Sequence, residues 1–353
     1  MTQGPRIIWD KGSAYDLFVS LFILHRPDEF GLRPSWAAGV RSRLPIALRD
    51  FLEQAQKFIL VPLPFIYSLP EPKNATAVLD ALKALPPEDR LPSLVFGPKQ
   101  DEETLAYKEF LSSLDGKQRL TASVEARIKE HYARSNRLTQ GRIRATFDAW
   151  SDRQAFGEKL CPALEAYVEN FYQEEELRII PAQARALEDA QVLASQMDPL
   201  SLLEELSAGV RMDWISGISK LILAPSFWGA PFVFFNTLDR DTGIILFGAR
   251  PEGMALIPGE LIPDELLNAL KALAEPTRLR ILRYLLEGPR TPSELARVLR
   301  LRLPTVIHHL DNLRLAGLVL VTVSPETERR YALRMEGVNK TIQYLQAFLS
   351  EDE

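Results

Sequence analysis

The chain has 353 residues, which is long enough for about two domains that each bury a core. Its 46% hydrophobic and 25% charged residues are typical of a soluble globular protein. A single cysteine, Cys161, excludes an internal disulfide and suits a reducing cytoplasm, and we expect it to be a buried, inert thiol rather than a redox sensor. The N-terminus lacks the charged and apolar pattern of a signal peptide, so we expect a cytoplasmic protein.

Residues 14–207 follow the three-and-four spacing of amphipathic helices and predict a mostly helical N-terminal domain. The segment AYDLFVSLFIL ends before His25, where a protonated imidazole would be favourable at the end of a helix. A later segment, FGLRPSWAAGVRSRLP, combines one tryptophan with three arginines, namely Trp36, Arg33, Arg41 and Arg43. It fits either a packed tryptophan beside solvated arginines or a surface that binds an anion or a partner.

After Ser207, short runs rich in β-branched and aromatic residues replace the helical pattern. The uncharged stretch 221–238 approaches the length of a membrane helix, but its two prolines and one glycine favour two buried strands joined by a turn. The segment DRDTG predicts a hairpin turn before GIILFGAR. We therefore expect a small antiparallel β-meander at about residues 219–250 to close the N-terminal domain, with no membrane-spanning segment.

The segment ARPEGMALIPGELIP predicts a linker, because it is rich in proline and glycine. It separates an N-terminal sensor or interaction domain, residues 1–258, from a C-terminal domain, residues 262–350. Residues 276–334 hold eleven arginines, no lysine and five acidic residues, a net charge of +6 that leaves −11 for the rest of a chain whose total is −5. This asymmetry indicates an acidic body that carries a basic module facing an anion.

The C-terminal segment begins with two expected helices, which flank a break near Pro276 and end at Gly288, a suitable C-cap. A third helix opens in TPSELARVL. Its start combines an N-cap, a proline at the first helical position and a capping-box glutamate, supplied by Thr291, Pro292 and Glu294.

A fourth helix is expected from Pro304 to Gly317, with its core stripe at Val306, Leu310 and Leu313. Three polar residues face away from that stripe, namely His308, Asp311 and Asn312. His309 lies only about 60° from the stripe. Two strands around SPETE follow, and helices followed by a hairpin are the order of a winged helix-turn-helix. The predicted fold class is mainly α with small antiparallel β elements.

Three segments resemble the ArsR-type family of bacterial winged-helix regulators. They are LKALAEPTRLRILRYLLEG, SELARVL and TVIHHLDNLRLAGLV. The resemblance implies a homodimeric regulator that binds double-stranded DNA with the fourth helix in the major groove. The DNA-contacting residues that it implies are Arg300, Arg302, Thr305, His308, His309, Asn312, Arg329 and Arg330. Arg302, Leu303 and Pro304 stand where family members carry small polar residues, Ile307 replaces another polar residue, and Asp311 replaces a frequent lysine. These departures imply either readout through apolar contacts with thymine methyl groups or a modest affinity for DNA.

The adjacent histidines could also belong to a metal site, a catalytic site or a solvated surface. A metal site is disfavoured because neighbouring helical residues do not converge on one ion and no nearby Cys or His assists them. Family members that sense thiophilic metals use cysteine pairs, which the segment TPSELARV lacks. No GxSxG, HExxH or phosphate-binding loop indicates catalysis, so we expect neither a cofactor nor an enzyme.

The last expected helix places Val338, Ile342, Leu345 and Leu349 on one stripe, and in the family this helix and the first helix of the module form the dimer seam. The sequence thus predicts a one-component, dimeric transcriptional regulator whose N-terminal domain senses an unknown ligand or partner. Two alternatives stay open. The N-terminal domain could be enzyme-like with a fused autoregulatory module, or the winged helix could serve protein contacts.

Overall fold

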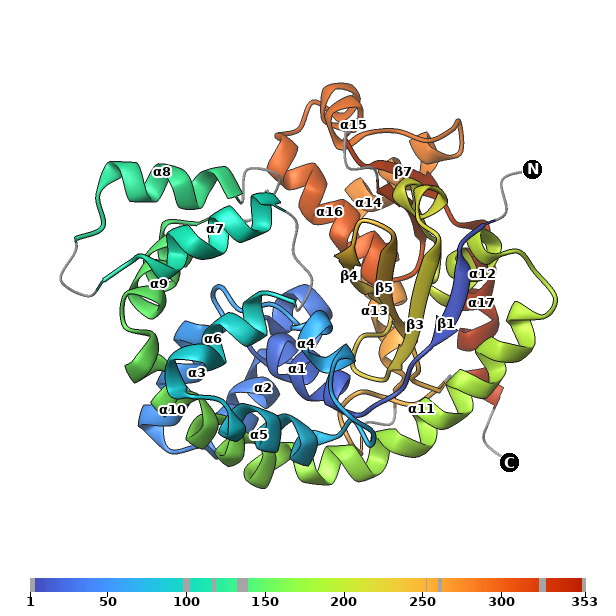
Figure 1. The fold of residues 1–353 in the computed structure, drawn as a ribbon. Helices are drawn as coiled ribbons and strands as arrows, with labels where there is room; N and C mark the ends of the chain where they lie inside the picture. The colour runs from blue at the N-terminus through green and yellow to red at the C-terminus, as the bar shows by residue number, and fades with distance from the viewer. Residues whose placement is uncertain are drawn as a thin grey trace.

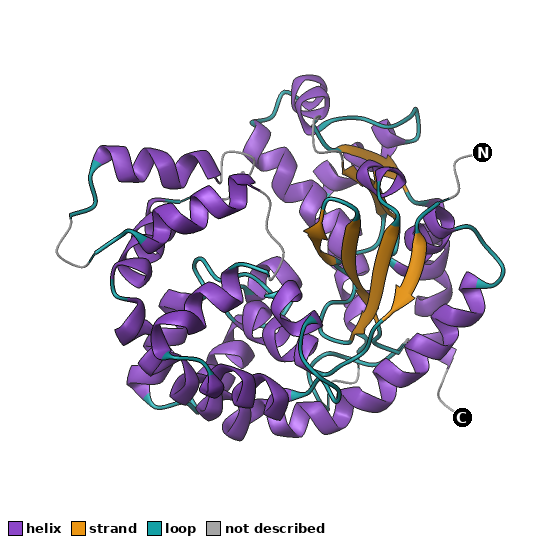
Figure 2. Ribbon diagram, viewed as in Figure 1, coloured by secondary structure: helices purple, strands orange, loops and turns teal. Residues whose placement is uncertain are grey.

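The computed structural model describes residues 4–97, 102–115, 119–131, 139–251, 253–259, 262–323 and 328–350. Helices dominate it, and a small central sheet separates a helical body from a C-terminal module (Figures 1 and 2). The sheet has the order β1-β3-β5-β4, with β1 at Arg6–Trp9, β3 at Lys220–Ser226, β5 at Thr242–Gly248 and β4 at Phe234–Asp239. The predicted class, mainly α with small β elements, is confirmed.

Both faces of the two central strands, β3 and β5, are buried, so apolar side chains are needed on each face. Alternate residues pack into the core of the helical body, namely Ile222, Ala224, Ile244 and Leu246. The residues between them pack into a second core that includes the C-terminal module, namely Leu221, Leu223, Ile245 and Phe247. Burial on both faces is typical of parallel strands, and β3 and β5 are indeed parallel neighbours.

The predicted antiparallel meander is wrong in its strand pairing. β4 and β5 form the expected antiparallel hairpin, but β5 lies between β4 and β3, and β1 pairs in parallel with β3. The sequence pattern identified the strands at 220–226 and 242–248 as buried, yet periodicity carries no information about which buried strands are neighbours. Strand β1 comes from the other end of the chain and was not predicted.

The helical body fills the left and lower parts of Figure 1. Its first helices are α1 (Ala14–Leu24), the 3₁₀ turn η1 (Pro27–Phe30), α2 (Pro34–Arg41), α3 (Ile46–Ala55), α4 (Leu63–Tyr67), α5 (Ala75–Ala84), α6 (Pro87–Val95) and α7 (Glu102–Ser112). The later ones are α8 (Ala122–His131), α9 (Gln140–Ser151), α10 (Arg153–Tyr167), the π-helical turn η2 (Val168–Tyr172) and α11 (Gln173–Ala194). Helix α12 (Pro199–Leu206), at the right of Figure 1, and the 3₁₀ turn η3 (Asp213–Gly217) pack into the second core instead.

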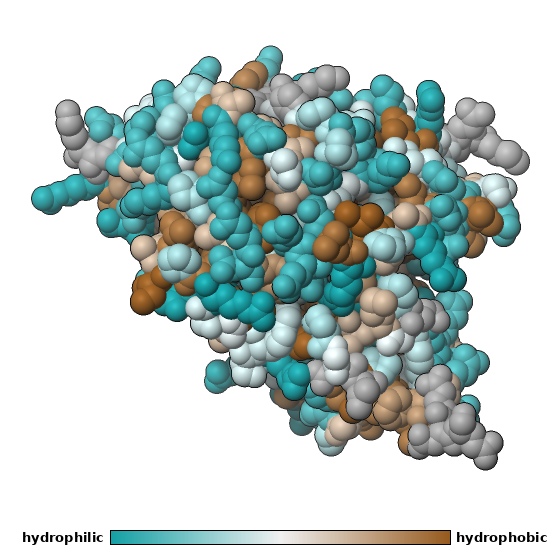
Figure 3. Space-filling view, turned by 90° about the horizontal axis from the view of Figure 1, so that it is seen from below, coloured by the Kyte–Doolittle hydropathy of each residue, from teal (hydrophilic) through white to brown (hydrophobic). Residues whose placement is uncertain are grey.

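Helix α1 is the centre of this body, since all of its residues are buried. A helix that is apolar on every side belongs in a core rather than on a surface. Cys161 on α10 is buried as well, and burial raises the pKa of its thiol, which confirms the expectation of a buried cysteine. Seen from below, the molecule shows mostly hydrophilic side chains with scattered apolar groups between them (Figure 3).

One carboxylate, Asp16, lies within the apolar helix α1 and joins it to two other elements. Its Oδ1 accepts hydrogen bonds from Ser226 Oγ at 2.6 Å and the Trp228 amide at 2.9 Å. Its Oδ2 accepts from Gln183 Nε2 at 2.6 Å and the Phe227 amide at 2.8 Å. Burial raises the pKa of Asp16 to about 6, against the lowering effect of these four donors. Every donor faces an acceptor, so the network fixes α1 to α11 and to the end of β3.

We expect Asp16→Asn to lower the free energy of unfolding by about 3 kcal/mol, because the new amide group would face two donors and leave them unpaired in the core. Chemical denaturation measures the loss. Asp148→Asn is the matched control, since Asp148 is half exposed in a surface pair with Arg144 and should cost about 0.5 kcal/mol or less. An Asp16 variant as stable as this control would contradict the role given to the network.

The C-terminal module contains the predicted helices and hairpin. They are α13 (Asp264–Leu273), α14 (Pro276–Leu285), α15 (Pro292–Leu299), α16 (Leu303–Leu315), β6 (Val319–Val323), β7 (Arg330–Leu333) and α17 (Met335–Ser350). The capping box at Thr291 and Glu294 is present, with Pro292 at the start of α15. Strands β6 and β7 form the antiparallel wing, and the SPETE turn between them lies almost wholly outside the described residues.

An unexpected third strand extends the wing sheet. Strand β2 (Val210–Met212), from the segment after α12, pairs in parallel with β6. Gly209 leads into it with a φ of +97°, and a Cβ there would lie 2.3 Å from Cδ2 of Leu320. Glycine adopts this backbone conformation without the strain that a side chain would bring, and a Cβ here would also displace the Leu320 side chain. The wing is therefore tied to a segment that the sequence assigns to the N-terminal part.

The predicted linker segment is packed in its middle, although the described residues on either side of that part are exposed. Leu256 and Ile257 are buried in the core of the helical body. The Leu256 amide donates to Asp264 at 2.6 Å, and its carbonyl accepts from Arg178 at 2.9 Å. The second core also contains residues from α12, β2 and the C-terminal module together. The segments on either side of residues 249–263 thus share one hydrophobic core. Among the described residues, no helix is long and apolar enough to span a membrane.

Candidate nucleic-acid interface

Helix α16 has the predicted orientation. Val306, Leu310 and Leu313 are fully buried in the second core, which fixes the rotation of the helix about its axis. The helix starts after Arg302 with Pro304 in its first turn, and its first residues are exposed. The N-terminal half of α16 therefore presents its outward face to solvent, as a helix that enters a DNA groove must.

Thr305 and His308 are exposed on this outward face, with half-buried Asn312 one turn further along. The Asn312 side-chain amide donates to the His308 carbonyl at 2.7 Å and lies 3.3 Å from His308 Nε2. These contacts join the two side chains into one polar pair. The pair has the donors and acceptors that base edges require, although the Asn312 amide is already in use within the helix.

His309 lies at the flank, as the helical geometry predicted, and is mostly covered. Its Nδ1 lies 3.6 Å from a carboxylate oxygen of Glu275, the N-cap residue of α14. Burial lowers the pKa of His309, with the Glu275 charge acting in the opposite direction. The imidazole is therefore neutral near pH 7 and belongs to the junction of α14 and α16. A phosphate contact by this side chain stays a prediction.

The four arginines of the predicted DNA-contacting set are all exposed. Arg300 is exposed in a left-handed backbone conformation at the end of α15, and Arg302 is exposed directly before α16. Arg329 and Arg330 are exposed at the start of the second wing strand. The wing is held beside α15 because Ser293 donates from its hydroxyl and its amide to Glu328, at 2.8 and 3.2 Å. Two of the arginines thus directly precede α16, and the other two lie on a wing that is bonded to α15.

The C-terminal half of α16 faces the helical body, which the sequence did not indicate. The Arg314 guanidinium lies 5.1 Å from the ring centre of Phe232. Leu315 lies against Gly31 at the end of η1, where an added Cβ would come within 3.0 Å of its Cδ2. Asp311 borders a cavity whose other walls belong to the body. Asp311 is therefore turned towards the body.

A family model described as bacterial regulatory protein, arsR family, matches residues 275–320, from the N-cap of α14 into β6. Residues 275–320 are an ArsR-family helix-turn-helix domain. The ArsR-family match includes Arg300, Arg302 and all of α16, whereas the wing arginines lie beyond it. The resemblance inferred from the sequence is therefore confirmed.

The ArsR-family domain is also similar to proteins called HTH-type transcriptional regulator CmtR. The relatives come from Mycobacterium bovis and from two strains of Mycobacterium tuberculosis, each 48% identical over 74 residues. That stretch is 21% of this chain and 62% of each relative, so the chain spans less than two thirds of their length. A crystal structure of an ArsR family transcriptional regulator is 30% identical and covers 28% of this chain and 99% of its own, with a TM-score of 0.23.

Proposed function

We propose that the chain is a cytoplasmic, one-component transcriptional regulator that binds double-stranded DNA through its ArsR-family domain. The observation that carries the proposal is the exposed N-terminal half of α16 within the ArsR-family match. Residues 262–350 would form the DNA-binding and dimerisation domain. Residues 1–258 would form a domain that senses a ligand or partner without a catalytic role of its own.

The proposed DNA contacts are of two kinds, those to base edges and those to phosphates. Thr305, His308 and Asn312 would reach base edges, since they lie on the outward face of α16. The arginines around the helix would contact phosphates, because guanidinium groups bind them in a bidentate manner. The net charge of +6 on residues 276–334 supports this division, although the chain as a whole is acidic.

The test of the phosphate contacts is the double variant Arg329→Ala/Arg330→Ala. We expect it to weaken binding to every DNA sequence to a similar extent, and to reduce the slope of log K against log salt concentration by about 2. Fluorescence anisotropy with several duplexes at different salt concentrations measures both effects. Arg153→Ala/Arg240→Ala, in the N-terminal part, is the control and should leave the slope unchanged. An unchanged slope in the wing variant would contradict this role.

We further propose that the regulator is a dimer, with its seam on α13 and α17. These two helices pack against each other, and apolar side chains on them are exposed in the single chain, namely Leu270, Ile342, Phe348 and Leu349. Two-fold symmetry would then present two copies of α16 about 34 Å apart. We expect Ile342→Glu to convert the dimer to a monomer in sedimentation velocity experiments. A wild-type chain that sediments as a monomer at micromolar concentration would contradict the proposal.

A further inference from the structure

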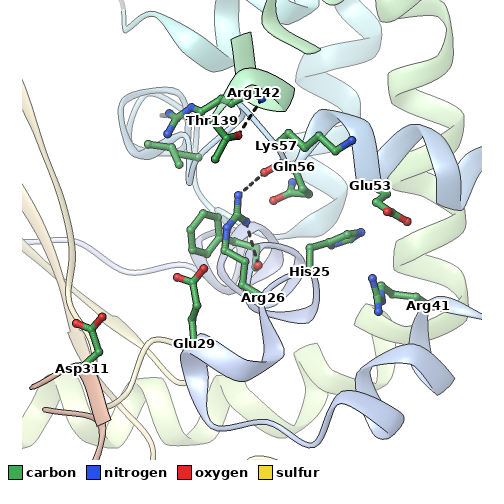
Figure 4. Close-up of a pocket in the computed structure, with 12 residues that line it drawn as sticks. His25, Arg26, Glu29, Arg41, Glu53, Gln56, Lys57, Thr139, Arg142 and Asp311 are labelled. Atoms are coloured by element: carbon green, nitrogen blue, oxygen red, sulfur yellow. Dashed lines mark hydrogen bonds between the residues drawn. The ribbon is translucent and has the colours of Figure 1, made fainter. Parts of the chain in front are cut away.

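A cavity of about 640 Å³ lies where the helical body meets α16 (Figure 4). Its walls come from the end of α1, from η1, α2, α3 and the start of α9, and from Asp311 on α16. Cavities of roughly 300–1,000 Å³ are typical of sites for small molecules. The proposed DNA contacts do not use this cavity, so its polar lining requires a separate explanation.

Basic side chains approach the cavity from several elements, namely Arg26, Arg41, Lys57 and Arg142. Arg26 lies near the middle of Figure 4, where its guanidinium donates to the carbonyl oxygens of Phe22 and Gln56. Carboxylates line the same cavity, namely Glu29, Glu53 and Asp311. The mixture favours a molecule that carries an anionic group for the cations and hydrogen-bond donors for the carboxylates.

His25 contributes an acceptor with a defined orientation. Its Nδ1 lies 2.8 Å from the Leu21 carbonyl oxygen. A carbonyl only accepts, so Nδ1 carries the proton and donates it. Burial lowers the pKa of His25 to about 4, so the ring is neutral and its Nε2 carries a lone pair. That buried Nε2 has no hydrogen-bond partner among the described residues.

Gln56 supplies a second unpaired acceptor in the cavity wall. Its side chain is only 5% exposed, and its Oε1 has no hydrogen-bond partner in the described part of the chain. A buried acceptor without a donor costs about 1–3 kcal/mol. Ordered water could satisfy one such atom, but the cavity is many times larger than the ~30 Å³ that one water occupies. Two buried acceptors beside several cations are the features of a site that receives hydroxyl groups and an anion.

We propose that this cavity binds a small organic anion that also carries hydroxyl groups, such as a sugar phosphate or a hydroxycarboxylic acid. The anionic group contacts Arg41 and its neighbouring cations, and the hydroxyl groups donate to His25 Nε2 and Gln56 Oε1 after the side chains that cover these two atoms move aside. Asp311 places the site in contact with the DNA-reading helix, so the bound molecule is the effector of the regulator. This last step rests on the proposed function, whereas binding itself does not.

The test is isothermal titration calorimetry on the full chain without DNA. The probes are a panel of sugar phosphates, a panel of hydroxycarboxylic acids, inorganic phosphate and neutral glucose. We expect a member of one hydroxylated panel to bind at least tenfold more tightly than phosphate or glucose, and the panel that binds identifies the anionic group. Binding by neither panel overturns the proposal, and so does equal binding of phosphate or of glucose.

Two variants locate the site. Arg41→Met removes a cation and Gln56→Met removes a buried acceptor at similar volume, and each should weaken binding of the selected ligand at least tenfold. Arg43→Met is the matched control, because Arg43 is exposed nearby and does not line the cavity. Arg41 is only partly buried, so its variant tests the site even where Gln56→Met lowers stability. Wild-type affinity for the ligand in Arg41→Met overturns the proposal. Because the titrations contain no DNA, their outcome does not depend on whether the chain binds DNA.

Discussion

The double variant His308→Ala/Asn312→Ala is expected to bind its operator about 100-fold more weakly than the wild-type chain. Each base contact of this kind contributes about 1–3 kcal/mol, and the two side chains form one polar pair on α16. Neither side chain belongs to the second core, so the melting temperature should change little. Anisotropy with operator and scrambled duplexes measures the effect, and the loss should be confined to the operator.

The control for this variant is Gln154→Ala/Glu158→Ala on α10. These residues have the same spacing, are exposed, and share a hydrogen bond of 2.6 Å, but they belong to the helical body. Operator affinity should stay at the wild-type value in the control. Affinity of the His308/Asn312 variant within twofold of wild type would show that these two side chains do not read the DNA.

Gly337→Ala is expected to cause the largest loss of stability in the C-terminal module. A Cβ at Gly337 would lie 2.0 Å from the carbonyl oxygen of Gly317, which is backbone and cannot rotate away. The start of α17 would have to move away from the turn at Gly317, and forcing extra volume into a packed site typically costs about 1–3 kcal/mol. We expect a lower melting temperature together with loss of the dimer.

Gly39→Ala gives the matched comparison for this clash. Gly39 lies within helix α2, and a Cβ there would meet no atom within 4 Å. Alanine is favoured over glycine in a helix, so this variant should be as stable as wild type or slightly more stable. Equal melting temperatures for the two glycine variants would mean that the start of α17 does not pack against Gly317 as described.

The sequence predicted the helices of the C-terminal module well because the patterns that specify them lie within short segments. The capping box at Thr291 and the stripe of Val306, Leu310 and Leu313 each depend on residues a few positions apart. The sheet was predicted less well because its pairing is not local. Strand β1 pairs with β3 across more than 200 residues, and β2 joins the wing across more than 100. Neither short strand has a pattern that indicates its partner.

The cavity was predicted only in part. The segment around Trp36 left open a packed tryptophan or an anion-binding surface; the packed tryptophan is confirmed, and anion binding stays a prediction. Trp36 stacks on Trp228 with ring centres 6.2 Å apart, while Arg41 lines the cavity. The expected cation at His25 is wrong, because tertiary burial lowers its pKa to about 4 and outweighs the helix terminus. Asp311 could not be interpreted from α16 alone, since its surroundings come from the helical body.

The most direct test of DNA reading by the ArsR-family domain is the affinity of the wild-type chain for DNA from its own promoter, measured across salt concentrations. We expect tight binding at low salt, with log K falling linearly against log salt and with promoter DNA preferred over scrambled DNA at every concentration. The same chain showing no salt-dependent binding to any duplex would contradict a DNA-reading role for α16 and its surrounding arginines.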